Sequence, residues 1–366
     1  MFPPPPASDI DWKNVDLSLK IPVKGHVEAR HNASTGTWSA PILETNPNIS
    51  VSGISPALNY GQQCFEGLKA YRQASGDIVI FRPEVHAARI AKSAVSVCLP
   101  PPPKDLFVEC VRAAVAANAE LVPPSSSNGA LYIRPVLFGS SAQLALAPPE
   151  ESILAVYVYP LLPYHGSAAT DALVLEDFDR TAPFGTGPFK VGGNYAPVWK
   201  HAAAAKEKGY GITLHVDSAT RTKIDEFSTS GFLGFKSDGS SEKTLIVPLA
   251  ENAVQSVTSA SLTRIAELQG WTIQRDEVPL DTLPSIQEVV AVGTVAVVVP
   301  IRSISRLSTS EKFTFPGTSD PEKIESQLLG LARTLSEIVR GDREDIEGWC
   351  WKVTEHGGVS TPPSRL

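Results

Sequence analysis

Short apolar runs alternate with amphipathic stretches along most of the chain, which predicts strands interleaved with helices. In the first half, the runs at residues 78–81, 131–138 and 153–159 are rich in aliphatic and aromatic residues and predict strands. Apolar positions at helical spacing predict helices over residues 84–97 and 106–119. In the second half, strands are predicted over residues 172–176, 212–216, 232–235, 245–247, 288–292 and 295–299, and helices over residues 197–208, 259–269 and 321–340.

Two segments interrupt this pattern and suggest how the chain is divided. Residues 1–50 are rich in Pro, Asn, Ser and Thr and show little periodicity, so they predict an extended N-terminal arm. Residues 162–170 combine proline, glycine and serine, and we expect an interdomain loop there. A small α/β domain over residues 51–161 and a large domain over residues 171–366, ending in a flexible tail, follow from these breaks. Numerous strands flanked by helices predict an α+β fold.

Composition narrows the class of protein. A chain of 366 residues exceeds one domain of about 100–200 residues, so two domains are expected. A net charge of −7 argues against nucleic acid or an anionic membrane as the partner. The four cysteines lack the spacing of zinc ligands, so we expect no metal site. No apolar run approaches the about 18 residues of a membrane span.

The two ends of the chain bear on its location. The N-terminus begins Met1-Phe2 followed by four prolines, and it has the features of neither a secretory signal nor a mitochondrial presequence. The chain ends Ser364-Arg365-Leu366, a conservative variant of the Ser-Lys-Leu peroxisomal signal. We therefore expect a cytoplasmic or a peroxisomal protein.

The most informative segment runs from Gly185 to Tyr195 and places Lys190 among glycines just before a predicted helix. Its spacing does not fit the phosphate-binding loop with a GxxxxGK[ST] pattern. Taken alone, the segment is more typical of a surface lysine in a flexible loop, because glycines mark loops more often than sites.

The segment does not stand alone, because Lys190-Val-Gly-Gly-Asn-Tyr195 resembles the Lys-x-Gly-Gly-Asn-Tyr motif of the branched-chain amino acid aminotransferases. These are class IV pyridoxal-phosphate enzymes with the two-domain architecture of fold type IV. The resemblance extends in order from about residue 55 to 305. It includes Tyr60-Gly-Gln-Gln-Cys-Phe65-Glu66-Gly67, Phe81-Arg-Pro-Glu-Val-His86-Ala-Ala-Arg89, Tyr132-Ile-Arg134-Pro135, Leu262-Thr263-Arg264 and Gly293-Thr294-Val295-Ala296.

The resemblance implies a set of cofactor-binding residues. Lys190 would bond covalently to the aldehyde of pyridoxal 5′-phosphate and later move a proton as general acid and base. Glu226 would pair with the ring nitrogen, with Asp225 as the fallback, and Tyr195 would hydrogen-bond the ring oxygen. The phosphate would be held by the guanidinium of Arg89, by backbone amides of Leu262 and Thr263 at the start of a predicted helix, and by Thr294.

The resemblance also implies a substrate pocket. Arg134 matches a position associated with carboxylate recognition, and the pocket walls would come from Tyr60, Phe65, Tyr132, Tyr164, Val295 and Ala296. Each aromatic residue is equally compatible with a place in the core. The chain departs from the family at residues 228–231, which replace a glycine-rich turn, and at Leu162, where bacterial relatives often carry tryptophan.

Together these features imply a homodimeric branched-chain amino acid transaminase that transfers the amine of a hydrophobic L-amino acid to 2-oxoglutarate, as in branched-chain amino acid biosynthesis. A D-amino acid or (R)-amine transaminase and an aminodeoxychorismate-type lyase remain alternatives, because one fold supports several chemistries. A specialised aminotransferase that supplies unusual amino acids to secondary metabolism is a further one. The rival from another class, a cofactor-binding protein without turnover, is disfavoured by the intact Lys190, Glu226, Arg89 and Thr294.

Overall fold

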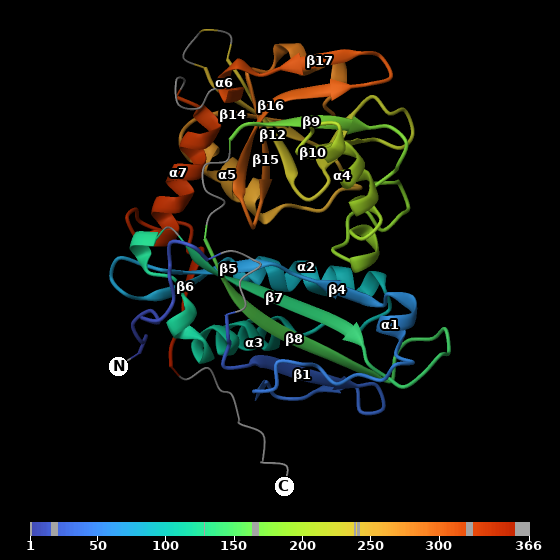
Figure 1. Cartoon of the computed structure of the whole chain (residues 1–366), viewed down its shortest axis with the longest axis vertical. Helices are drawn as coiled ribbons and strands as arrows, with labels where there is room; N and C mark the ends of the chain where they lie inside the picture. The colour runs from blue at the N-terminus through green and yellow to red at the C-terminus, as the bar shows by residue number, and fades with distance from the viewer. Residues whose placement is uncertain are drawn as a thin grey trace. The chain divides into compact units, whose positions relative to one another are not determined.

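A computed structural model describes residues 2–15, 21–127, 129–162, 168–237, 239, 242–319 and 325–355. The chain forms two compact units, coloured along the sequence in Figure 1. Unit 1 comprises Met1–Pro163, Lys190–Gly192 and Glu337–Leu366, and unit 2 comprises Tyr164–Phe189 and Gly193–Ser336. Unit 1 thus includes two segments that the sequence assigned to the large domain. The C-terminal tripeptide and Tyr164 lie outside the described residues.

Unit 1 is built on one antiparallel sheet, with the order β18-β6-β5-β7-β8-β1-β2, in which β3 also pairs with β1 and β4 with β7. The alternation of buried and less buried residues along the central strand β7 shows that one face of the sheet forms the core. The strands are β1 (His26–Asn32), β2 (Thr37–Trp38), β3 (Ile42–Glu44), β4 (Gln63–Phe65), β5 (Leu68–Arg72), β6 (Ile78–Phe81), β7 (Ala130–Gly139), β8 (Glu151–Leu161) and β18 (Cys350–Lys352).

Two long helices, α2 (Pro83–Ser96) and α3 (Lys104–Ala117), pack against each other and against this sheet, as Figure 1 shows. Proline at the first position and an acidic residue in the first turn explain why α2 begins where it does. The short elements are α1 (Pro56–Tyr60), η1 (Ala119–Leu121) and η2 (Ser125–Ser127). The two predicted helices and three predicted strands of this half are confirmed, with ends shifted by at most two residues.

The predicted N-terminal arm is wrong for its second part. Strand β1 pairs with β8 over six residues, and its first four residues are buried. The prediction failed because β1 carries His26, Glu28 and Arg30 among its apolar positions. These polar side chains pair with each other, since His26 Nε2 lies 3.1 Å from one oxygen of Glu28 and Arg30 donates to the other. Pairing lets a polar strand be buried without orphaned charges.

Unit 2 is built on a mixed sheet with the order β11-β10-β9-β16-β15-β12-β13-β14, and β17 pairs with β16. The pairs β9–β10, β9–β16 and β13–β14 are parallel, and the others are antiparallel. The strands are β9 (Thr170–Leu175), β10 (Ile212–Val216), β11 (Ile224–Phe227), β12 (Gly231–Lys236), β13 (Thr244–Pro248), β14 (Thr272–Asp276), β15 (Glu288–Gly293), β16 (Val297–Arg306) and β17 (Glu311–Thr314).

The helices of unit 2 and the ends of its strands differ most from prediction in two places. Residues 294–296 form the turn between β15 and β16, so β16 begins at Val297. The long predicted helix is shorter, since α7 covers Gln327–Arg340 and residues 321–324 lie outside the described part. The other helical elements are η3 (Gly192–Asn194), α4 (Val198–Glu207), α5 (Val257–Leu268), η4 (Leu280–Ser285) and α6 (Pro316–Ser319).

Candidate active site

In unit 1, the segment Lys190–Gly192 runs along the outer edge of β4. The backbone N–H of Phe65 donates to the carbonyl of Lys190 at 3.0 Å, and Val191 forms an antiparallel bridge with Cys64. The hydroxyl of Ser93, on α2, accepts from the backbone N–H of Lys190 at 2.9 Å. The main chain of the candidate reactive lysine is therefore fixed by hydrogen bonds on both sides.

The side chains of Lys190 and Arg134 both lie near the aromatic ring of Phe65. The Nζ of Lys190 is 4.7 Å from the ring centre of Phe65, and the guanidinium of Arg134 is 5.0 Å from the same ring. Arg134 also donates to the hydroxyl of Tyr132 at 2.8 Å. A Cβ at Gly67 would collide with that hydroxyl, which explains why the motif carries glycine there. Four residues singled out by sequence thus lie together.

A buried ion-pair cluster supports this region from the helix side. Glu66 is completely buried; its two oxygens accept from Nε and Nη2 of Arg89 at 2.6 and 2.7 Å, and Nδ1 of His86 lies 2.7 Å from it. Burial alone would raise the pKa of Glu66, but the charges and hydrogen bonds of Arg89 and His86 outweigh it and hold that pKa well below its usual range. The planar fork of Arg89 is therefore oriented by a fixed carboxylate.

Two other substrate-side residues in unit 1 lie apart from this group. Tyr60, at the end of α1, is about half exposed, and its hydroxyl donates to the carbonyl of Leu144 at 2.7 Å. Leu162 is buried beside Gly129, where an added Cβ would contact its side chain. Leu162 therefore fills space in the unit 1 core, and the structure gives no reason to treat it as a pocket wall.

In unit 2, the two candidate acids of β11 have different partners. Strand β11 pairs with β10, and Asp225 is an extra residue in that ladder, between Glu226 opposite His215 and Ile224 opposite Val216. Such a bulge re-aims neighbouring side chains. Asp225 accepts from the hydroxyl of Thr181. Burial raises its pKa.

Glu226 is the acid that pairs with a cation, the guanidinium of Arg180. It is 5% exposed as a residue, and Oε1 lies 3.4 Å from Nη2 of Arg180. The guanidinium of Arg180 lies in turn 5.4 Å from the ring centre of Tyr195, and its Nη1 donates to the carbonyl of Gly187. Glu226, Arg180 and Tyr195 thus form one cluster, with Arg180 between the other two.

The predicted helix start at Ser259 is wrong, and with it the position of two predicted phosphate donors. Helix α5 begins at Val257, where the hydroxyl of Ser256 accepts from the N–H of Ser259 at 3.1 Å. Leu262 and Thr263 consequently lie in the second turn and are buried, and their amides serve the helix itself. The N–H groups that α5 leaves for a ligand are those of its first turn, at Val257 and Thr258.

Two turns of unit 2 lie side by side near this helix end. Gly293 sits against the hydroxyl of Ser230, and Gly231 lies against the Cβ atoms of Ser256 and Ser259. The turn after Gly293 carries three sequence-predicted residues, Thr294, Val295 and Ala296.

Residues 228–231, where the chain departs from the family's glycine-rich turn, do not direct all of their hydroxyls toward the start of α5. Ser228 is buried and bonds to the hydroxyl of Thr213 on β10, and its N–H donates to the Thr213 carbonyl. Its replacement of the family glycine therefore serves packing between strands.

Sequence reasoning missed several members of these clusters. Glu66 and His86 are part of the quoted motifs, and the spacing of three between His86 and Arg89 places both on one helix face. That spacing was the available signal. Arg180 and His215 belong to no motif and carry no local signal, because the pairing of β10 with β11 brings His215 to Glu226 and the loop after β9 brings Arg180 to it.

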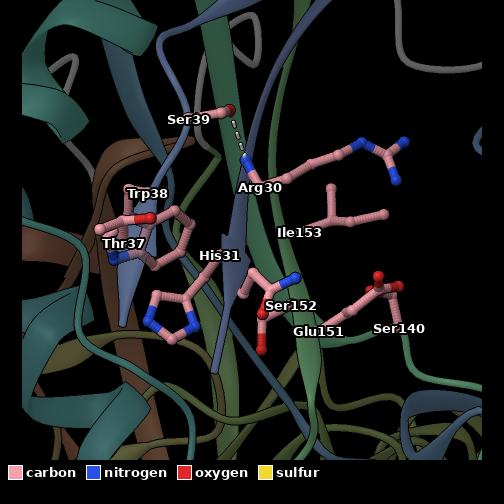
Figure 2. Close-up of a pocket in the computed structure, with 10 residues that line it drawn as sticks. Arg30, His31, Thr37, Trp38, Ser39, Ser140, Glu151, Ser152 and Ile153 are labelled. Carbon is pink, nitrogen blue, oxygen red and sulfur yellow. Dashed lines mark hydrogen bonds between the residues drawn. The ribbon is translucent and has the colours of Figure 1, made fainter. Parts of the chain in front are cut away.

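A separate pocket of about 290 Å³ lies at the β1–β2 hairpin (Figure 2). The rings of His31 and Trp38 lie 5.3 Å apart on one side of it, and the buried hydroxyl of Ser152 has no hydrogen-bond partner among the described residues. No residue predicted to act in chemistry lines this pocket. The full lining is Arg30, His31, Asn32, Thr37, Trp38, Ser39, Ser140, Glu151, Ser152 and Ile153.

Three known proteins described next are similar to this chain over more than nine tenths of its length. The chain is 46% identical over 363 residues to aminotransferase poxL of Penicillium oxalicum, covering 99% of this chain and 98% of that protein. It is 42% identical over 358 residues to branched-chain amino acid aminotransferase gloG of Glarea lozoyensis, covering 97% and 99%. The structure of a T.th. branched-chain amino acid aminotransferase with pyridoxamine 5′-phosphate is 25% identical, with a TM-score of 0.71, and the match covers 91% of this chain and 100% of that chain.

The residues present fit the cofactor of these relatives, pyridoxal phosphate. An aldehyde requires an amine, which Lys190 offers from a fixed backbone. A protonated ring nitrogen requires a carboxylate, and a phosphate requires amides and hydroxyls. Unit 2 contains the buried Glu226 beside Arg180, and it contains the first turn of α5 with the capping Ser256. The cofactor is pyridoxal phosphate.

The extent of the family match settles the classification. The amino-transferase class IV model matches residues 63–304, which include every motif quoted above from Phe65 onward. Within the described part of the chain, no helix is long and apolar enough to cross a bilayer. Two units built on separate sheets, with Lys190 and Glu226 in the expected motifs, have the architecture of fold type IV. The chain belongs to the class IV aminotransferases.

Proposed function

We propose that this protein transfers the amine of a hydrophobic, branched-chain-like L-amino acid to 2-oxoglutarate, giving the 2-oxo acid and L-glutamate. The observation that carries the proposal is the group formed by Lys190, Phe65, Arg134 and Tyr132. It offers an amine, an aromatic wall and a carboxylate receptor on one face of unit 1. A hydrophobic substrate and an acidic one both require these elements.

The chain's own residues have distinct roles in this proposal. Pyridoxal phosphate supplies an electron sink for the substrate's Cα–H bond. Lys190 would hold the cofactor through its aldehyde and would act as the acid and base that moves the proton of the substrate's Cα. Glu226 would pair with the ring nitrogen, and Tyr195 would hydrogen-bond the ring oxygen. Arg89, Thr294 and the first-turn amides of α5 hold the phosphate.

The substrate contacts complete the assignment. Arg134 receives a carboxylate, and its bond to Tyr132 keeps the guanidinium pointed along the sheet face. The proposed pocket walls are Tyr60, Phe65, Tyr132, Val295 and Ala296, together with Tyr164, which lies outside the described residues. A homodimer is part of the proposal, because α1 and the 139–149 loop expose Leu58, Tyr60, Leu144 and Leu146.

Replacement of Lys190 tests the reaction class. Lys190→Ala is expected to abolish turnover and the yellow colour of the purified protein, because no other group replaces its amine at that point. Lys200→Ala, an exposed lysine on α4, is the matched control and should keep both. Turnover measured with Lys190→Ala would overturn the assignment.

An amino-donor panel with 2-oxoglutarate as acceptor tests the substrate class. We expect L-leucine, L-isoleucine and L-valine to be the best donors in coupled glutamate assays. Preference for a D-amino acid or an (R)-amine would replace the proposed function with the corresponding alternative. Preference for an uncommon L-amino acid would support the specialised enzyme instead.

A further inference from the structure

A buried histidine in unit 2 has no task in the proposed function. His215, on β10, is 1% exposed, and neither of its ring nitrogens has a hydrogen-bond partner among the described residues. Burial lowers its pKa to about 3, and the nearby charges of Arg180 and His201 act in the same direction. The ring is therefore neutral at physiological pH, with one N–H donor and one acceptor nitrogen.

The sheet register places this ring beside Glu226. His215 and Glu226 are directly opposite each other in the antiparallel β10–β11 pair. Opposite residues point to the same face, with Cβ atoms about 4.5–5.5 Å apart. An imidazole and a carboxylate at that separation are within reach of a hydrogen bond, either direct or through one water.

The other groups around the ring define what it can bond. Arg180, which pairs with Glu226 at 3.4 Å, has a buried Nε that also lacks a partner among the described residues. The ring of Phe178 closes another side, 6.4 Å from His215, and it stacks on His201, whose Nδ1 lies 3.8 Å from Asp177. The Nε of Arg180 and the two ring nitrogens of His215, which all lack hydrogen-bond partners among the described residues, therefore belong to two residues that each neighbour Glu226.

We propose that His215 is a positioning residue for Glu226, accepting from Nε of Arg180 and donating to the Glu226 carboxylate. This inference rests on the proposed role of Glu226 as partner of the cofactor's ring nitrogen. A carboxylate held from the strand side keeps its other oxygen directed at the ligand. Arg180 is the cationic partner of that carboxylate, and a neutral ring beside it adds no second positive charge.

A purely apolar role for the ring is disfavoured by what surrounds it. A leucine or phenylalanine would fill the same volume without burying two polar nitrogens, which is unfavourable when they stay unbonded. Buried polar atoms left without partners call for an explanation by a ligand, a water or a function. The position of His215 beside Glu226, the proposed partner of the cofactor's ring nitrogen, supplies such an explanation.

The test compares the affinity and absorbance of the bound cofactor in full-length variants. His215→Leu is expected to weaken pyridoxal 5′-phosphate binding about 10-fold, since a lost hydrogen bond to a charged group has that size. It should also shift the midpoint of the cofactor's visible absorbance titration, because Glu226 then holds the ring nitrogen less well. His215→Gln keeps a donor and an acceptor and should restore most of both.

The control is His26→Leu, the same change at an equally buried histidine of unit 1. It should lower the melting temperature without moving the affinity or the titration midpoint. His215→Met, whose flexible chain fits irregular space, replaces His215→Leu if the latter does not fold. If the apolar variant has the cofactor affinity and titration midpoint of the wild type, the inference is overturned. It is also overturned if His215→Gln loses as much cofactor affinity as the apolar variant does.

Glu226→Gln separates this inference from the proposed function beneath it. If Glu226→Gln leaves affinity and midpoint unchanged, the role of Glu226 fails, and the role of His215 fails with it. If Glu226→Gln changes both while the apolar His215 variants change neither, only the role of His215 fails.

Discussion

Two buried glutamates, one in each unit, differ in how completely their surroundings are satisfied. Glu66 has bonds of 2.6 to 2.7 Å from Arg89 and His86 to both of its oxygens. Glu226 has an ion pair of 3.4 Å with Arg180, inside a cluster where Arg180 Nε and the His215 ring lack partners among the described residues. Both carboxylates lie in motifs that resemble one family, yet their environments are opposite.

This difference indicates that the two glutamates have different roles. A carboxylate that is held tightly by an arginine and a buried histidine, as at Glu66, orients those neighbours and holds the fold. A carboxylate whose neighbours have unused polar groups, as at Glu226, lies in a cluster that is prepared for a ligand. We therefore expect replacement of Glu66 to act mainly on stability and replacement of Glu226 mainly on turnover.

The largest effect is expected for Glu66→Gln. Removing one partner of a buried ion pair leaves the others uncompensated, so the free energy of unfolding should fall by about 3–5 kcal/mol at pH 7. Because the folded-state pKa of Glu66 is lowered, its contribution is complete above the unfolded value of about 4.3 and decreases as pH falls further. Urea denaturation at pH 7 and pH 4 measures both.

Glu120→Gln is the control for this variant. Glu120 pairs with Lys24 at 3.1 Å on the surface, so its loss should cost less than about 1 kcal/mol. Equal losses of unfolding free energy in the two variants would contradict the stabilising role of the buried Glu66 ion pair.

The reverse result is expected for Glu226→Gln. Loss of an electrostatic contact made to the reacting system typically lowers kcat by about 100-fold or more. The unfolding free energy should change much less than in Glu66→Gln, because the remaining amide keeps the same shape. Steady-state kinetics with saturating cofactor measure kcat, and the same urea titration measures the free energy of unfolding. A stable variant with full kcat would contradict the expected difference between Glu66 and Glu226.

The smallest effect concerns the response of stability to acid. His215 has a folded-state pKa of about 3, below its unfolded value, so the unfolded chain takes up a proton that the folded chain excludes. Stability is therefore lost as pH falls below about 6.5, by up to about 1.4 kcal/mol per pH unit. His215→Leu should lose about 2 kcal/mol less than the wild type between pH 6.5 and 5. Parallel losses in the two proteins would contradict a neutral buried ring.

The sequence predicted the elements of both units better than the contacts of the site. Periodicity located the long helices and core strands, because burial of one face imposes a regular pattern. It failed at β1, whose polar residues are compensated by partners within reach of the same strand. The motif resemblance singled out Lys190 and Glu226 as candidates. The start of α5 was missed by two residues, because the segment Ser256–Ser261 carries several residues able to cap a helix.

The cluster around Glu226 could not be predicted at all from local sequence. Arg180, His215 and Glu226 are separated by 35 and 11 residues and meet only through the pairing of β10 with β11 and the return of the loop after β9. Register along a ladder decides which side chains become neighbours, and a shift of one residue would turn Glu226 to the opposite face.

The two-sided anchoring of the Lys190 backbone by Phe65 and Ser93 has a kinetic meaning. In the proposed role of Lys190, with its Cα held in place, the amine would remain within one side-chain length of the reacting carbon whenever it is released. It would act as a tethered base whose effective concentration far exceeds that of any free base in solution. Small amines added to Lys190→Ala would have to compete with that tether, and only very high concentrations would return a measurable fraction of the rate.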